Sequence, residues 1–226
     1  SKEDRPALAT IIDDLLGQFD EHRSAWIDAA GEQAWVIAER EVVLLRQALA
    51  MSSQKPSARD RAMADNVEWV LATHPPGTRM VAWAHNGHVS RAPSEAFEPM
   101  GSFLSASLGD DYVAIGFAFN QGSFQAIDWS QGRDKGRGLA EHTVGPAPED
   151  SLDAALAGSG LPIFVLDLHK VPSRGIVARW FRAPHLLRQI GAVFSGESRM
   201  GTAVVVTDHF DAVAFVNRTT RARPVE

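Results

Sequence analysis

The chain has 226 residues, of which 45% are hydrophobic and 22% charged, a composition typical of a globular domain with a hydrophobic core. Its net charge is −6, which argues against a nucleic-acid partner because such proteins present basic surfaces. Cysteine is absent, which excludes disulfides and thiolate chemistry, and no apolar run approaches the ~20 residues of a membrane span. We therefore expect no membrane partner, and a cytoplasmic location.

The first third of the chain, residues 1–73, is expected to be helical. Apolar residues recur at helical spacing from Leu8 to Phe19. Two further helices are predicted over residues 33–49 and 59–73, and a polar segment that contains Pro56 separates them. This part carries no strand signal, so we treat it as the helical part of the protein.

The remainder, residues 78–226, shows strand and helix patterns in alternation. The strands are predicted over residues 80–84, 112–119, 162–169, 203–206 and 212–216. Short helices are expected at residues 100–108 and 151–157, and a long exposed loop at residues 131–150. The pattern predicts an α/β fold with three layers, in which helices flank a parallel or mixed central sheet.

The most informative segment is residues 81–89, where an apolar run ends abruptly in two histidines. Val81 to Ala84 reads as a buried strand, and His85, Asn86, Gly87 and His88 follow it directly. Ligands of open α/β sheets bind beyond the carboxyl ends of strands. The unperturbed pKa of histidine, about 6.5, also suits proton transfer near neutral pH. These residues are therefore the candidate active-site edge.

Two positions on the preceding helix are weaker candidates. Arg61 and Asn66 lie five residues apart and so do not share one helical face. Either residue can line a cleft or support the histidine turn. The alternative is an arginine on the helix surface and an asparagine satisfied by packing.

Other chemistries remain open or are disfavoured. His85 and His88 could supply two zinc ligands, with a third from Asp167, His169, Asp208 or His209, yet no third ligand has a diagnostic spacing. We therefore expect no metal and no other cofactor. A serine nucleophile is disfavoured because the chain has no Gly-x-Ser-x-Gly elbow.

The order of these segments resembles the erythromycin esterase family. The similarity is strongest over residues 57–126 and returns near the end of the chain. It is carried by the histidine segment together with RDRAMADNVEW (59–69), MGSFL (100–104), LGDDYVAIGF (108–117), GSFQA (122–126), FDAVAFV (210–216) and TTRARP (219–224). The resemblance implies a metal-independent carboxylic ester hydrolase, of a kind that opens macrolide lactones and so gives macrolide resistance.

The resemblance also implies that one half of the protein lies elsewhere. Members of this family are about twice as long, and their first half carries a Gly-Glu-x-x-His-Gly type motif with a glutamate and a base histidine. Here Gly31 and Glu32 are followed by Gln33 and Ala34. Residues 1–226 therefore resemble the C-terminal portion of such a protein, without its catalytic N-terminal half.

By this resemblance His85 and His88 are catalytic, as groups that orient water, stabilise an oxyanion or protonate a leaving group. Asn86, Arg61 and Asn66 would bind substrate or support the site. The expected partners are a small ester or lactone and the missing N-terminal half, with self-association through an exposed sheet. The alternatives are a non-catalytic fragment or binding domain, and a metallohydrolase.

Overall fold

The computed structural model describes residues 3–51, 56–95, 97–130 and 138–223, and divides the chain into two compact units, residues 1–70 and 71–226. Parts of two predicted loops, residues 52–55 and 131–137, lie outside the described residues, as does Pro224 of the last family segment. Among the described helices none is long and apolar enough to cross a membrane.

The first unit is built from helices, as the sequence predicts. They are α1 (Arg5–Glu21), α2 (Arg23–Ala30), α3 (Glu32–Met51) and most of α4 (Ala58–Ala72). Phe19, Trp35 and Val42 form the buried cluster of this unit. The helix α2 is a separate element that the hydrophobic pattern did not resolve, because none of its residues is buried.

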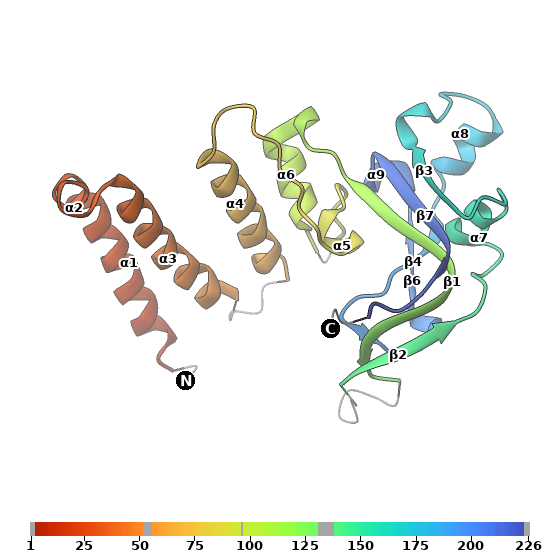
Figure 1. Ribbon diagram of the computed structural model, residues 1–226, viewed down its shortest axis with the longest axis horizontal. Helices are drawn as coiled ribbons and strands as arrows, with labels where there is room; N and C mark the ends of the chain where they lie inside the picture. The colour runs from red at the N-terminus through yellow and green to blue at the C-terminus, as the bar shows by residue number, and fades with distance from the viewer. Residues whose placement is uncertain (1–2, 52–55, 96, 131–137, 224–226) are drawn as a thin grey trace. The chain divides into compact units, whose positions relative to one another are not determined.

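The second unit contains a mixed five-stranded sheet in the order β2-β1-β7-β3, with β5 also paired to β1 (Figure 1). A separate antiparallel pair joins β4 to β6. The strands are β1 (Ile115–Asp128), β2 (Leu139–Val144), β3 (Ile163–Asp167), β4 (His185–Arg188), β5 (Val193–Phe194), β6 (Gly201–Val204) and β7 (Ala212–Thr219). The further α-helices of this unit are α5 (Asn86–Val89), α6 (Met100–Leu108), α7 (Leu152–Ala157), α8 (Ile176–Phe181) and α9 (Val206–His209). The prediction of an α/β fold with a mixed sheet and a helical first part is confirmed.

One face of the β1-β7-β3 region is buried and the other is not. β1 runs parallel to β7, and β7 runs antiparallel to β3. Ala118, Val213 and Phe215 are at most 2% exposed on the core face. Because side chains alternate along a strand, the intervening residues of these strands point to the opposite face.

The prediction of a buried strand over residues 80–84 is wrong, because this segment belongs to no sheet of the described residues. The backbone there is neither strand nor helix, and Val81 and Trp83 are 91% and 82% exposed. The physical reason is that no strand of the described residues pairs with this segment. The apolar run predicted burial, but in the described residues Val81 and Trp83 stay exposed.

Two further predictions about the sheet need correction. β1 does not end near Phe119; it continues through Asn120 and Gly122 to Asp128. Gly122 makes this possible because a Cβ there would lie 2.2 Å from the carbonyl oxygen of Thr219 on β7. The expected long loop also contains β2, which pairs with the second half of β1.

Candidate functional site

The two histidines are presented by the short helix α5, at the end of the extended apolar segment. His85 is the N-cap residue of α5, and its Nδ1 atom accepts a hydrogen bond from the backbone N–H of Gly87 at 3.1 Å. His88 lies in the same turn, and its backbone N–H donates to the carbonyl of His85 at 2.8 Å. The sequence-predicted pair is therefore held in one turn, with both side chains partly exposed.

Hydrogen bonding fixes the chemical form of His85. Because Nδ1 accepts from Gly87, the proton of a neutral ring resides on Nε2. Burial lowers the pKa of His85 from its ordinary value of 6.5, and the neighbouring His88 lowers it further. A hydrogen bond with the backbone of Ile190 acts in the opposite direction. His85 is thus suited to donate a hydrogen bond near neutral pH rather than to carry a charge.

Asn86 ties α5 to the sheet. Its Nδ2 donates to the carbonyl of Phe117 at 2.7 Å, and its Oδ1 accepts from the N–H of the same residue at 2.9 Å. Asn86 is buried, and both ends of its amide are used on the β1 backbone. Asn86 therefore holds α5 against β1, and its expected part in a substrate site stays a prediction.

Two more contacts fix the far end of α5. The Tyr112 hydroxyl donates to the carbonyl of Val89 at 2.7 Å, and burial raises the pKa of Tyr112 to about 12, so this donor keeps its proton. A Cβ on Gly101 would lie 2.2 Å from the same Val89 oxygen. Glycine at that position therefore allows α6 to pack directly on the backbone of α5.

The residues after α5 are anchored by a polar network that the sequence did not reveal. Ser90 Oγ lies 2.7 Å from Nδ1 of His209. Arg91 pairs with the buried carboxylate of Asp211, which also lies 3.1 Å from His169 Nε2 and accepts from the N–H of Ala114 at 2.7 Å. These partners are far apart in sequence, so no local motif could identify them.

Ser90 and His209 form a serine–histidine pair, but it lacks access to a substrate. Ser90 is 4% exposed, and its hydroxyl oxygen also accepts from the N–H of Ala92 at 3.2 Å. Burial lowers the pKa of His209. We assign this pair to holding the loop after α5.

The segment that follows β4 lies close to Gly87. A Cβ on Gly87 would lie 3.3 Å from His85 Nδ1 and 3.7 Å from Gln189 Oε1, so the Gln189 side chain faces this turn. Gln189 and Ile190 carry no motif, and sequence analysis missed both. Their position depends on Arg188, the last residue of β4.

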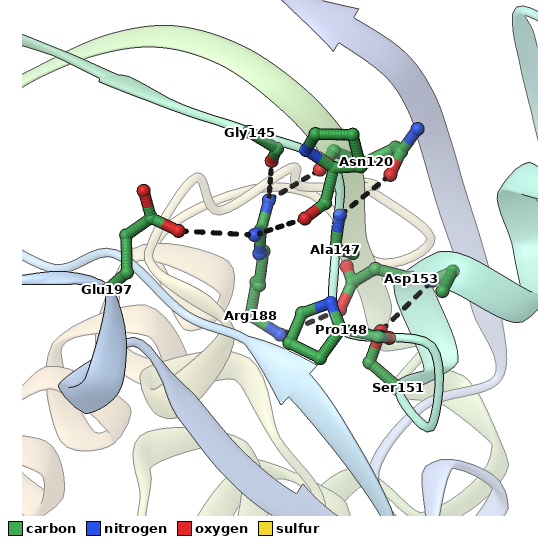
Figure 2. Close-up of polar contacts among 10 residues, drawn as sticks. Asn120, Gly145, Ala147, Pro148, Ser151, Asp153, Arg188 and Glu197 are labelled. Atoms are coloured by element: carbon green, nitrogen blue, oxygen red, sulfur yellow. Dashed lines mark hydrogen bonds and ion pairs between the residues drawn. The ribbon is translucent and has the colours of Figure 1, made fainter.

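Arg188 is held by a buried network that Figure 2 shows. Its guanidinium donates to the carbonyls of Asn120, Gly145 and Pro146, and its backbone N–H donates to Asp153 Oδ2 at 2.8 Å. The other oxygen of Asp153 accepts from the N–H of Phe119 at 3.1 Å. Burial raises the pKa of Asp153 to about 6. The network joins β1, α7 and β4. It therefore fixes the start of the segment, Gln189 and Ile190, that lies near His85 and Gly87.

The two remaining candidates lie on α4, in the first unit. Asn66 accepts a hydrogen bond from Arg40 through Oδ1, and the Arg40 guanidinium stacks over Trp69 at 4.9 Å from the ring centre. Arg61 is exposed, and its backbone N–H donates to Ser57. Their expected role in the site stays a prediction.

Three of the four side chains considered as a third metal ligand, Asp167, His169 and His209, make other polar contacts. Asp167 accepts from the N–H of His169, and His169 and His209 contact Asp211 and Ser90. Within the described parts of the chain, no three His, Asp or Glu side chains converge as a metal ion requires.

The described residues thus combine a helical unit with a mixed α/β unit in which a short helix carries two histidines. The family model of erythromycin esterase matches residues 1–219. The chain therefore belongs to the erythromycin esterase family, as its sequence pattern indicated.

Individual relatives agree with this assignment. The chain is 27% identical over 120 residues to erythromycin esterase type II of Escherichia coli, a match that covers 51% of this chain and 29% of that protein. The crystal structure of a Bacillus cereus protein matches with a TM-score of 0.82 at 18% identity. An erythromycin esterase mutant in its open conformation matches with a TM-score of 0.69 at 16% identity.

The extent of these matches is unequal. They cover 97% and 96% of this chain, but only 53% and 54% of the Bacillus cereus protein and of the erythromycin esterase mutant. The chain thus spans about half the length of the solved structures that it resembles, and these likenesses show the fold.

Proposed function

We propose that this chain supplies one wall of the active site of a carboxylic ester hydrolase, with His85 and His88 in that wall. The observation that carries the proposal is the hydrogen bond from Gly87 to Nδ1 of His85. It leaves the ring proton on Nε2, where a neutral histidine is a hydrogen-bond donor. Such a donor suits a site in which negative charge develops on oxygen.

The reaction we propose is direct attack of water on an ester carbonyl. A base takes one proton from the water as its oxygen bonds to the carbonyl carbon, and the carbonyl oxygen becomes an oxyanion. The Nε2–H of His85 donates a hydrogen bond to this oxyanion; the bond between the carbonyl carbon and the alkoxide oxygen then breaks, and the proton held by the base passes to the leaving alkoxide, so that an acid and an alcohol result.

The general base of this reaction is not His85, because its Nδ1 lone pair is already used by Gly87. We propose that the base comes from the part of the erythromycin esterase fold that this chain does not match. The substrate class, a small ester or a macrolide lactone, follows the name of the Escherichia coli relative. No cofactor enters the proposed steps.

The test is hydrolysis by the protein as its own gene produces it. An aryl acetate and a 14-membered macrolide lactone are supplied, and released acid is followed by pH-stat titration. Turnover of either substrate supports an ester hydrolase. If neither substrate is turned over by a folded protein that binds the lactone, the second candidate function, a binding domain without catalysis, replaces it.

A further inference from the structure

The segment over residues 79–84 has the properties of a β-strand without its partner. None of the hydrogen bonds found in the described part of the chain involves these residues. Val81 and Trp83 are among the most exposed large apolar side chains there. Backbone groups left without partners next to apolar side chains form a template for strand pairing.

The segment adjoins an exposed apolar face of the sheet. We call this the bare face and define it by Ile115 and Phe117 of β1 and by Ile163 and Val165 of β3, all exposed. Phe117 is opposite Ala214 of β7, which is opposite Val165, so these residues form one row across the sheet. The Trp83 ring lies 5.1 Å from the Phe117 ring, which connects the segment to this face.

Such a surface is unusual for a folded protein. Val165 and Ile163 are 67% and 71% exposed, whereas Ala118 of β1 and Val213 and Phe215 of β7, on the other face of the sheet, are at most 2% exposed. Contiguous apolar surface of this kind marks a site where another part of a structure packs. The near-continuous apolar character of residues 80–84 is typical of a strand buried on both sides.

We propose that residues 79–84 pair as a β-strand with a polypeptide that supplies the half of the erythromycin esterase fold that this chain does not match, and that this polypeptide covers the bare face. Solved chains with this fold match nearly all of the present chain yet are about twice as long. They therefore hold enough additional polypeptide to pair the strand and cover the face. This inference does not depend on the proposed hydrolysis.

Hydrogen exchange measured by mass spectrometry tests the pairing. It is applied to the protein produced from its natural gene, whose intact mass is measured first, and to the 226 residues alone. In the 226-residue chain, peptides covering residues 79–84 exchange at the rate of an open chain. In a natural protein heavier than 24.5 kDa, the same peptides exchange at least ~100-fold more slowly, as paired strands do.

Three outcomes overturn the proposal. The first is a natural protein in which residues 79–84 exchange freely, whatever its mass. The second is protection that appears only in a complex of two identical chains, which makes a second copy the occupant. The third is protection within the monomeric 226-residue chain, which means that the chain covers its own segment.

A pair of variants gives an independent measurement. Val81→Lys places a charge in the proposed interface, and Ile176→Lys places one on α8, where Ile176 is 75% exposed. In the natural protein Val81→Lys lowers Tm by ~5 °C or more and Ile176→Lys by less than ~1 °C. In the 226-residue chain neither variant changes Tm by more than ~1 °C. Equal effects of Val81→Lys in the two proteins contradict the proposal.

Discussion

The side-chain amide of Asn86 makes two hydrogen bonds to the backbone of Phe117, one as donor at 2.7 Å and one as acceptor at 2.9 Å. This pair fills positions that a neighbouring strand would occupy on the edge of β1. It also fixes the first residue of α5 beside the sheet. The positions of His85 and His88 therefore depend on the residue between them.

Replacing Asn86 should destabilise the second unit. Asn86→Leu removes both hydrogen bonds and leaves the N–H and C=O of Phe117 without partners, which should lower the free energy of unfolding by about 2–3 kcal/mol. Asn86→Asp keeps the acceptor but sets a carboxylate oxygen against the Phe117 carbonyl and buries a charge, so its effect should be at least as large near neutral pH. Urea unfolding followed by circular dichroism measures both. Equal stability of the wild type and Asn86→Leu would contradict this role.

The buried carboxyl of Asp153 should make stability depend on pH. Its pKa is raised from 3.8 to about 6 by burial, so the folded state binds this proton more tightly than the unfolded chain. The stabilisation of the folded state by this proton is complete below about pH 4 and is lost as the pH rises through 6. The stability of the wild type relative to Asp153→Asn should therefore fall by about 2 kcal/mol between pH 4 and pH 7.

The matched control for this measurement is Asp150→Asn, which changes an exposed carboxyl three residues away. Its unfolding free energy should follow that of the wild type across the same pH range. If Asp153→Asn also follows the wild type at every pH, Asp153 does not titrate as described.

Removal of metal ions should leave any hydrolysis unchanged. Of the four side chains considered as third ligands, Asp167, His169 and His209 make other polar contacts, and in the described residues no three His, Asp or Glu side chains converge. Activity on an aryl acetate should therefore be the same before and after dialysis against a chelator. Complete loss, with recovery on addition of zinc, would favour the metallohydrolase alternative.

Local patterns predicted much of the fold. Helical periodicity placed α3, α4 and α6, and apolar runs bounded by turn residues placed β3 and β7. The same reasoning failed for residues 80–84. An apolar run is typical of a buried strand, but it does not show whether a neighbouring strand is present to pair with it. It also ended β1 too early, because Asn120 and Gly122 resemble a turn although the backbone of Thr219 packs against Gly122.

The residues around the candidate site also fall into two groups: those that a local sequence pattern could indicate and those that only the structure reveals. His85 and His88 could be proposed from the sequence because they follow a strand-like segment. The position of Gln189 and Ile190 near them could not, since it depends on the long-range hydrogen bond between Arg188 and Asp153. Asn86 was expected near the site, but only the structure shows that its amide is used by Phe117.

The most direct test of the account is the effect of His85 substitutions on ester hydrolysis by the naturally produced protein. His85→Ala should lower kcat by ~100-fold or more because it removes the Nε2–H donor. In His85→Gln the side-chain amide can also donate a hydrogen bond, so kcat should fall clearly less than in His85→Ala. His74→Ala, at an exposed position before Pro75, serves as the control and should retain full activity. A change of less than about threefold in folded His85→Ala would remove His85 from the site.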